Sequence, residues 1–131
     1  MVTVCGLSEP VTGFGIPLRQ LPVSATVIDA QALQAWQARR LEDLTGLVPG
    51  VVAEPLNAGL STALKLRGFA LTRLHYNGLP DIQRMFRCDL VTVERVEVLR
   101  GPAALPDGIT SPGGVVNYVG KRPSTEPRHT P

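Results

Sequence analysis

The sequence predicts an α+β domain, built as a small mixed β-sheet with short helices and long loops. Three observations support this fold class. Runs rich in β-branched residues with a period of two recur along the chain, which is typical of strands. Stretches of strong helix formers are short and carry capping residues. The 131 residues include 13 glycines and 12 prolines, which divide the chain into short elements and many turns.

Composition narrows the class of protein. The formal net charge is +2, from 13 Lys and Arg against 11 Asp and Glu, which is too balanced for a nucleic-acid-binding surface. Hydrophobic residues make up 44% of the chain and aromatic residues only 5%, so an aliphatic core is expected in one domain. The sequence has no secretory signal and no apolar run of about 18 residues, so no membrane-spanning helix is expected. If the chain acts in the cell envelope, we therefore expect it to be a mature fragment, an excised piece or the product of a truncated reading frame.

The first elements follow from alternation and capping. Residues 23–28 alternate and are β-branched, which predicts a strand. Asp29 is a good N-cap for a helix over residues 30–36, which consists of strong helix formers. Leu33 and Trp36 lie three positions apart and are expected to share one face of that helix.

The middle of the chain predicts one more helix and three β segments. Apolar residues at helical spacing predict a helix over residues 41–47, ended by Pro49-Gly50. Strands are expected over residues 51–53 and 64–67, and a further β-rich run over residues 71–76.

Tight turns and caps organise the next segment. Asn77-Gly78 predicts a two-residue hairpin turn, because both residues tolerate a positive φ. Residues 82–87 form a polar, basic loop, and Asp89 is expected to cap one helical turn over residues 90–93. The apolar parity changes between Val93 and Val96, which fits a helical turn feeding into a strand.

The clearest signal lies in residues 94–123. Val96 and Val98 share one parity while Glu97 and Arg100 flank them, which predicts a half-buried strand. Gly101-Pro102 ends this strand. A glycine- and proline-rich crossing then leads through Gly113-Gly114 into a second strand over residues 115–119, which Gly120–Pro123 ends.

The residues favour no catalytic or metal chemistry. His75 and His129 are the only histidines, and neither belongs to a cluster with ligand spacing. Cys88 and Ser111 lack a neighbouring base and oxyanion hole in sequence, although His75 could meet Cys88 in space. Cys5 and Cys88 are expected to be free thiols. The chain is therefore not expected to be an enzyme.

Several motifs, in this order, resemble the plug domain of TonB-dependent outer-membrane siderophore receptors. The similarity covers about residues 22–123, nearly the whole chain. It is carried by LEDLTGLVPGV (41–51), LRGF (66–69), YNGLPD (76–81), ERVEVLRGP (94–102), GGVVN (113–117) and KRP (121–123). Pro106-Asp107-Gly108 stands where the family commonly has a triplet similar to Leu-Tyr-Gly, which affects the local loop shape.

The resemblance implies an organisation and a set of partners. Residues 16–123 would be the plug, residues 1–15 a flexible N-terminal segment, and residues 124–131 a tail toward a β-barrel that this chain lacks. Val2, Thr3 and Val4 resemble a remnant of the TonB box, which binds TonB by strand addition. An ordinary disordered terminus is an equal alternative.

The resemblance also assigns a role to two arginines. Arg67 and Arg100 lie in LRGF and LRGP, and in the family these arginines pair with glutamates on the inner wall of the surrounding barrel. We call Arg67 and Arg100 the latch arginines. In this chain alone they are expected to be solvated or to pair with Glu94 or Glu97.

In the family, apical plug loops contact the ferric siderophore, which is the transported ligand; no cofactor bound by the chain itself is implied. The matching loops are residues 56–62, 79–87 and 103–108. Within them or beside them, the residues expected to contact an anionic ferric siderophore are Tyr76, Arg84, Phe86 and Arg87. A solvated basic loop is an equal alternative. The implied location is the outer membrane, inside a barrel and facing the periplasm.

Two other classes of function stay open from the sequence. The chain could be a free-standing periplasmic module of plug fold that binds a ligand or a partner; tight siderophore binding without a barrel would favour it. A hydrolase that uses Cys88 would require that alkylation of this thiol abolish a measured activity.

Overall fold

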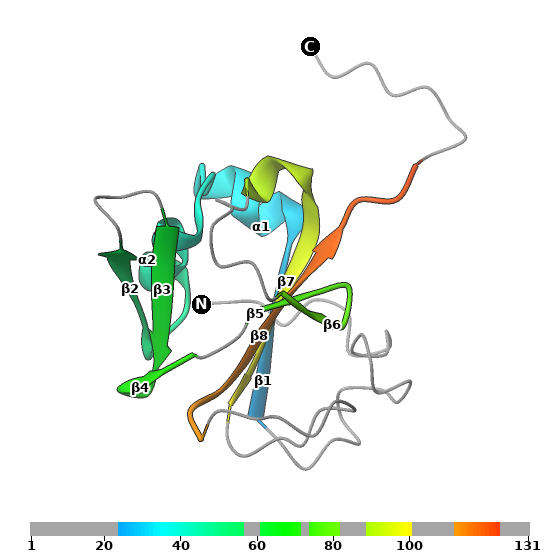
Figure 1. The fold of residues 1–131 in the computed structure, drawn as a ribbon. Coiled ribbons are helices and arrows are strands. Elements are labelled where there is room, and N and C mark those ends of the chain that lie inside the picture. Colours follow the sequence, from blue (N-terminus) through cyan, green and yellow to red (C-terminus); the bar gives the residue numbers. More distant parts are fainter. Residues whose placement is uncertain (1–23, 57–60, 72–73, 82–88, 101–111, 124–131) are drawn as a thin grey trace.

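The computed structural model describes residues 24–56, 61–71, 74–81, 89–100 and 112–123. Its larger sheet has five strands in the order β1-β7-β8-β5-β6 (Figure 1). These strands are β1 (Ser24–Asp29), β5 (Leu74–Tyr76), β6 (Leu79–Asp81), β7 (Val93–Arg100) and β8 (Gly114–Gly120). β5 runs parallel to β8, and every other neighbouring pair is antiparallel. The sheet is therefore mixed, which confirms the predicted fold class.

A second sheet was not predicted as a separate unit. It has three antiparallel strands in the order β2-β3-β4, namely β2 (Val51–Leu56), β3 (Ser61–Leu66) and β4 (Phe69–Ala70). β2 is longer than the strand predicted over residues 51–53 because it pairs with β3 along its whole length. Pro55 fits this position because β2 lies at the edge of the sheet, where a proline breaks no ladder bond on its open side.

Four short helical elements complete the described fold. They are α1 (Ala30–Ala35), η2 (Leu41–Asp43), α2 (Leu44–Leu47) and η4 (Leu90–Thr92). Side-chain caps begin two of them, as predicted. The Oδ1 atom of Asp29 accepts a hydrogen bond from the Ala32 amide at 2.7 Å, and the Oδ1 atom of Asp89 accepts one from the Val91 amide at 3.0 Å.

Leu33 and Trp36 do not share a helix face as predicted, because Trp36 lies just beyond the end of α1. α1 ends at Ala35, and Trp36 is its C-cap with φ −90° and ψ 0°. Leu33 is buried, whereas Trp36 is 68% exposed. The helix ends one residue too early for the spacing rule to hold, because Gln37 takes a positive φ of 53° and turns the chain away.

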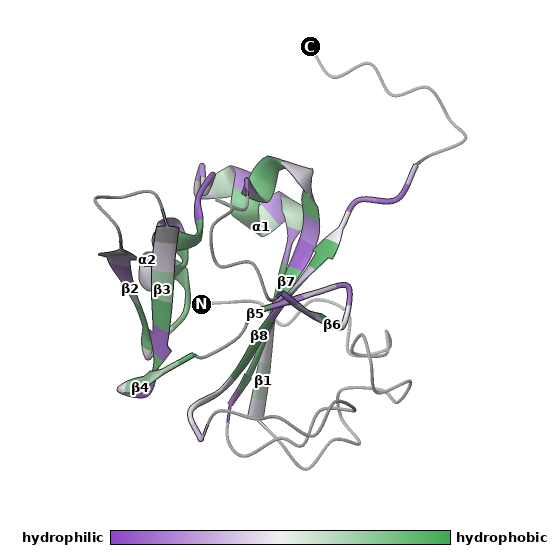
Figure 2. Ribbon diagram, viewed as in Figure 1, coloured by the Kyte–Doolittle hydropathy of each residue, from purple (hydrophilic) through white to green (hydrophobic). Residues whose placement is uncertain are grey.

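Both sheets and the helices share one aliphatic core. Leu44 and Leu47 of α2 are buried in the same cluster as Leu64 and Leu66 of β3 and Val98 of β7. Figure 2 shows the hydrophobic residues along β8 and the more hydrophilic β5–β6 hairpin beside it. One continuous core explains how so small a chain holds two short sheets in a fixed relation.

The strands β7 and β8 are central and buried on both faces, so the prediction of a half-buried strand was wrong for β7. Val96 and Val98 lie on one face, and Glu97 and Leu99 on the other, yet all four are buried. β1 and β8 flank β7 on either side, and packing covers both of its faces. The pairing register shifts between Val93 and Arg95, where the sequence predicted a change of parity.

The hairpin turn predicted at Asn77-Gly78 is confirmed. Tyr76 pairs with Leu79 across it, and the two turn residues have φ values of 50° and 82°. β5 (Leu74–Tyr76) lies within the β-rich run predicted over residues 71–76, of which residues 72–73 lie outside the described part of the chain. Two-residue turns with both φ values positive match the natural twist of a hairpin.

The described residues include neither a candidate membrane-spanning helix nor a candidate cluster of metal ligands. None of the helices in this part of the chain has the length and apolar character that crossing a membrane requires. No group of three or more His, Cys, Asp or Glu side chains in the same part could hold a metal ion.

Candidate docking site

Arg67 lies in a turn, not at the end of a strand as predicted. β3 ends at Leu66, which pairs with Phe69 of β4, so Arg67-Gly68 is a two-residue hairpin turn. The φ values are 54° for Arg67 and 82° for Gly68. The Arg67 amide donates a hydrogen bond to the Gly50 carbonyl at 2.9 Å, which ties the turn to the start of β2. A non-glycine residue at positive φ is uncommon, and this one occurs at a residue with a suggested function.

We therefore expect Arg67→Gly to stabilise the domain by up to about 1 kcal/mol, since glycine adopts a positive φ at no steric cost. Arg67→Ala is the matched control, because it removes the same guanidinium and keeps the unfavourable φ. Urea unfolding of both variants measures the difference. Equal stability of the two variants would contradict the assignment of backbone strain to residue 67.

Arg100 ends β7 directly opposite Gly114, the first residue of β8. Gly114 has φ 125°, a conformation that side chains rarely adopt. A Cβ atom placed on Gly114 would lie 2.0 Å from the Leu99 carbonyl oxygen and 3.0 Å from the Arg100 Cα atom. Only a glycine allows the backbone of β8 to begin this close to the end of β7.

The two latch arginines lie at the same end of the molecule. A Cβ atom on Gly113 would lie 2.4 Å from the Leu66 carbonyl oxygen, so the turn that holds Arg67 rests against Gly113. Gly114, the next residue, pairs with Arg100. Standard bond lengths and strand spacing then place the Cα atoms of Arg67 and Arg100 no more than about 15 Å apart. In Figure 1 the β3–β4 turn and the start of β8 both lie at the lower side.

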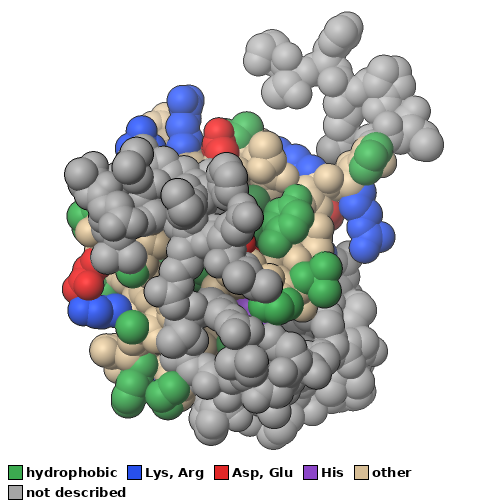
Figure 3. All heavy atoms as spheres, viewed as in Figure 1, with side chains coloured by type: hydrophobic (Ala, Val, Ile, Leu, Met, Phe, Trp, Pro, Cys, Tyr) green, Lys and Arg blue, Asp and Glu red, His purple; other side chains and the backbone are tan. Residues whose placement is uncertain are grey.

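We call this region the arginine end; it consists of Arg67, Phe69, Arg100, Gly113 and Gly114. Arg67 is exposed and Arg100 is half-buried. Phe69 is 51% exposed beside them, which places apolar surface next to cationic surface. Figure 3 shows hydrophobic side chains at the surface where β4 lies.

Neither latch arginine forms an ion pair with another residue in the part of the chain that the structure describes. The expected pairing of a latch arginine with Glu97 does not occur among these residues. Glu97 accepts a hydrogen bond from Nε of Arg95 at 2.8 Å, on the face of β7 opposite to Arg100. The other predicted carboxylate, Glu94, is exposed.

Of the predicted ligand-binding residues, the structure describes only Tyr76. Its ring centroid lies 5.3 Å from that of Tyr118, at an interplanar angle of 55°. A Cβ atom on Gly120 would lie 2.2 Å from the Tyr76 hydroxyl oxygen, so this side chain reaches the end of β8 remote from Gly114. The other predicted contacts lie outside the described residues, namely Arg84, Phe86 and Arg87 for the ligand and Val2, Thr3 and Val4 for TonB. Cys5 and Cys88 lie outside them as well.

The sequence reading missed a buried polar chain of hydrogen bonds. Glu97 is 1% exposed and Asn117 is 2% exposed. The Nδ2 atom of Asn117 donates to Oε2 of Glu97 at 2.8 Å, and Oδ1 of Asn117 accepts from the Gly78 amide at 3.0 Å. A usable signal was present for Asn117, which interrupts an otherwise apolar strand. Polar groups in such positions need partners when both faces are buried.

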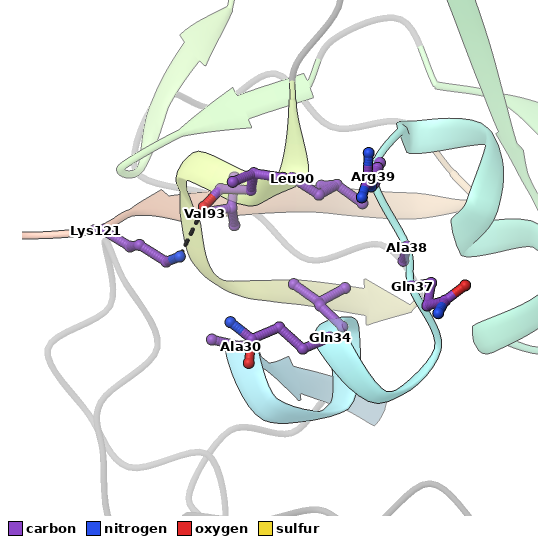
Figure 4. A pocket seen from close by; sticks show the side chains of 10 residues that line it. Ala30, Gln34, Gln37, Ala38, Arg39, Leu90, Val93 and Lys121 are labelled. Atoms are coloured by element: carbon purple, nitrogen blue, oxygen red, sulfur yellow. Dashed lines mark hydrogen bonds between the residues drawn. The ribbon is translucent and has the colours of Figure 1, made fainter. Parts of the chain in front are cut away.

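A pocket of about 350 Å³ lies at the other end of β7. Ala30 and Gln34 of α1 face Leu90 and Val93 across it (Figure 4). Nζ of Lys121 donates to the Val91 carbonyl at 2.7 Å and so helps to form one wall. Because β7 separates this pocket from Arg100, it is not part of the arginine end.

The described residues thus form two small sheets on one aliphatic core, with two arginines that no described carboxylate neutralises. Comparison with known families gives the class. Residues 17–115 match the model of the TonB-dependent Receptor Plug Domain. The chain belongs to this family, which confirms the resemblance seen in its motifs.

Curated relatives are transport receptors. The ferrichrome outer membrane transporter/phage receptor of Escherichia coli K12 is 34% identical over 120 residues, which cover 85% of this chain and 16% of that protein. The ferric-pyoverdine BN7/BN8 receptor of Pseudomonas putida is 29% identical over 122 residues, or 91% of this chain and 15% of that protein. The chain thus spans about a sixth of the length of these relatives.

Solved structures agree with the sequence matches. The ferripyoverdine receptor of the outer membrane of Pseudomonas aeruginosa, bound to ferripyoverdine, aligns with a TM-score of 0.72 and 26% identity over 88% of this chain and 16% of that one. The ferric-catecholate import receptor of E. coli K12 aligns with a TM-score of 0.71 and 27% identity over 92% of this chain and 18% of that one.

Proposed function

We propose that this chain is the plug, or gate, of a larger outer-membrane receptor that takes up a ferric siderophore and depends on TonB. The observation that carries the proposal is that Arg67 and Arg100 lie at the same end of the molecule. A single enclosing wall can contact both arginines there. Family membership and the ferric-siderophore receptors among the relatives support the same assignment.

The physical chemistry of arginine explains how such a gate would be held. A guanidinium binds carboxylates bidentately in a fixed geometry and stays charged at all physiological pH values. If acidic residues of a barrel wall enclose Arg67 and Arg100, each pair becomes a confined ion pair. Removing one partner would then leave a buried charge, at a cost of about 3–5 kcal/mol. The exposed ring of Phe69 adds apolar contact area at the same place.

The remaining contacts follow the family pattern as proposals. The loop that contains Arg84, Phe86 and Arg87 would contact the ferric siderophore, with the exposed part of Tyr76 near its base. Val2–Val4 would bind TonB as an added strand. The domain would lie inside the barrel in the outer membrane, with its N-terminal segment toward the periplasm.

A plug exchange tests the proposal. Residues 16–123 would replace the plug of the E. coli ferrichrome transporter, which is 34% identical to this chain over 120 residues. We expect the chimaera to keep the outer membrane closed to a large antibiotic. The variant Arg67→Ala/Arg100→Ala should weaken closure by about 10-fold or more, because two confined charge pairs are lost.

Arg122→Ala is the matched control, because Arg122 is exposed and lies beyond the opposite end of β8. It should leave closure unchanged. A chimaera as permeable as a transporter without any plug would contradict the assignment as a gate. Uptake of ferric ferrichrome by the chimaera, with and without TonB, tests the ligand class and the energy source separately from closure.

A further inference from the structure

Two polar strand residues, Glu97 of β7 and Asn117 of β8, hold the β5–β6 hairpin in place. We propose that Glu97 and Asn117 are a positioning pair that fixes the Asn77-Gly78 turn, and with it the β5–β6 hairpin, on the central sheet. The pair itself is read from the described contacts. Its effect on ligand binding rests on the proposed function.

The hairpin needs such a fixing element because its strand pairing is short. The described residues of β5 pair with β8 at two ladder positions, His75 with Asn117 and Tyr76 with Tyr118, and the pairing is parallel. An isolated two-stranded hairpin is marginally stable in water. The hairpin therefore depends on contacts from outside its own ladder.

Side chains supply those contacts at the turn. The Gly78 amide donates to Oδ1 of Asn117 at 3.0 Å, and the Gly120 amide donates to Oδ1 of Asn77 at 2.9 Å. Each asparagine thus bonds to the backbone of the opposite element. The Asn77 amide also donates to the Tyr118 carbonyl at 3.0 Å. Together these bonds define the register of the turn on β8.

Glu97 determines which way the Asn117 amide points. A carboxylate only accepts hydrogen bonds and a backbone amide only donates them. Asn117 lies between these two groups, so its Nδ2 must face Glu97 and its Oδ1 must face Gly78, as observed. The Nε atom of Arg95 donates to the other carboxylate oxygen and balances its charge. If the Asn117 amide were flipped, its Nδ2 donor would face the N–H donor of Gly78, and no hydrogen bond could form there.

Both ends of this chain of contacts have a role in the proposed gate. Glu97 lies three residues before Arg100 on β7, and the hairpin ends at Asp81, where the loop toward Arg84 and Arg87 begins. Oδ2 of Asp81 accepts a hydrogen bond from the Tyr118 hydroxyl at 2.6 Å, which fixes the last residue of β6 to β8 as well. The positioning pair therefore links the base of the candidate ligand loop to the strand that ends in a latch arginine.

A reversal of hydrogen-bond polarity tests the pair. In Glu97→Gln, the new amide NH2 group would face the Nδ2 donor of Asn117. In Asn117→Asp, a second carboxylate would face that of Glu97. In the double variant Glu97→Gln/Asn117→Asp, the new Gln amide donates to the new Asp carboxylate. That carboxylate still accepts from the Gly78 amide, and the Gln oxygen still accepts from Arg95. The double variant therefore reverses the direction of the bond between residues 97 and 117 and keeps the direction of the bonds to Gly78 and Arg95.

The readout is amide hydrogen exchange of the full 131-residue chain by NMR. Each single variant should speed exchange at Gly78 and Gly120 by about 10-fold or more, and the double variant should return it to within about 3-fold of the starting protein. The Leu71 amide, bonded to the Leu64 carbonyl in the other sheet, is the internal control for global unfolding. It should change little in any of the variants.

The outcomes separate clearly. A double variant that exchanges as fast as the worse single variant, or that fails to fold, would overturn the proposal. Unchanged exchange at Gly78 in both single variants would overturn it as well. If the single variants unfold and the double variant folds, the pair is supported. In a further outcome, the double variant restores exchange in the 131-residue chain while the chimaera, even with the starting sequence, binds no ferric siderophore. That outcome would count against the proposed function and not against the positioning pair.

Discussion

Replacing Gly114 by alanine should cost roughly 3–5 kcal/mol of the free energy of unfolding, the largest effect of any single change considered for this chain. The new Cβ atom would lie 2.0 Å from the Leu99 carbonyl oxygen and 2.9 Å from Cδ2 of Leu66. Gly114 also has a φ of 125°, which alanine rarely adopts. Backbone cannot move aside as a flexible side chain can, so β8 would have to shift away from β7.

Gly46→Ala is the matched control for this prediction. Gly46 lies in α2, and a Cβ atom there would meet nothing within 4 Å. It should stabilise the domain by about 0.5–1 kcal/mol, because alanine favours the helix and restricts the unfolded chain. Urea unfolding followed by circular dichroism measures both variants. A loss below about 1 kcal/mol for Gly114→Ala would show that the start of β8 can relax, and would weaken the geometry given for the arginine end.

Leu66→Ala should destabilise the domain by about 2–5 kcal/mol, the second largest effect. Leu66 is fully buried at the end of β3, and it reaches Gly114 of the larger sheet. Its removal leaves a cavity where the two sheets meet. The turn with Arg67 follows directly, so closure in the plug-exchange chimaera should also fall, although both latch arginines remain.

Val52→Ala is the control for the cavity. Val52 lies in β2 of the same small sheet and is 48% exposed, so its truncation should change stability by about 0.5 kcal/mol or less. Chemical denaturation gives the stability and the antibiotic permeability of the chimaera gives closure. If Leu66→Ala lowered stability with no change in closure, the position of Arg67 would not depend on the packing between the sheets.

Much of the local structure followed from the sequence. The cap at Asp29, the turn at Asn77-Gly78 and the helical turn after Asp89 all arise from contacts within a few residues, and all are present. The change of parity after Val93 correctly located the irregular pairing of β7. The order of the motifs also indicated the family, because these motifs lie at turns and strand ends that this fold requires.

Other features could not be read from spacing. The alternation around Val96 predicted a strand with one solvent-exposed face. The two-residue period of a sequence cannot show whether other elements cover the polar face of the strand. Glu97 therefore read as a surface residue, although it is buried with Arg95 and Asn117 as partners. Arg67 read as the end of a strand, because only the pairing of Leu66 with Phe69 shows that it lies in the turn.

The sequence alone determined the fold class and the family, and its motifs predict a latch role for Arg67 and Arg100. Tertiary structure decided that Arg67 and Arg100, which are 33 positions apart in sequence, share one end of the molecule. The physical reason is that their proximity depends on two glycines, Gly113 and Gly114, which let three backbone segments approach within contact distance. Local propensity describes one segment at a time, and only the packed chain brings such segments together.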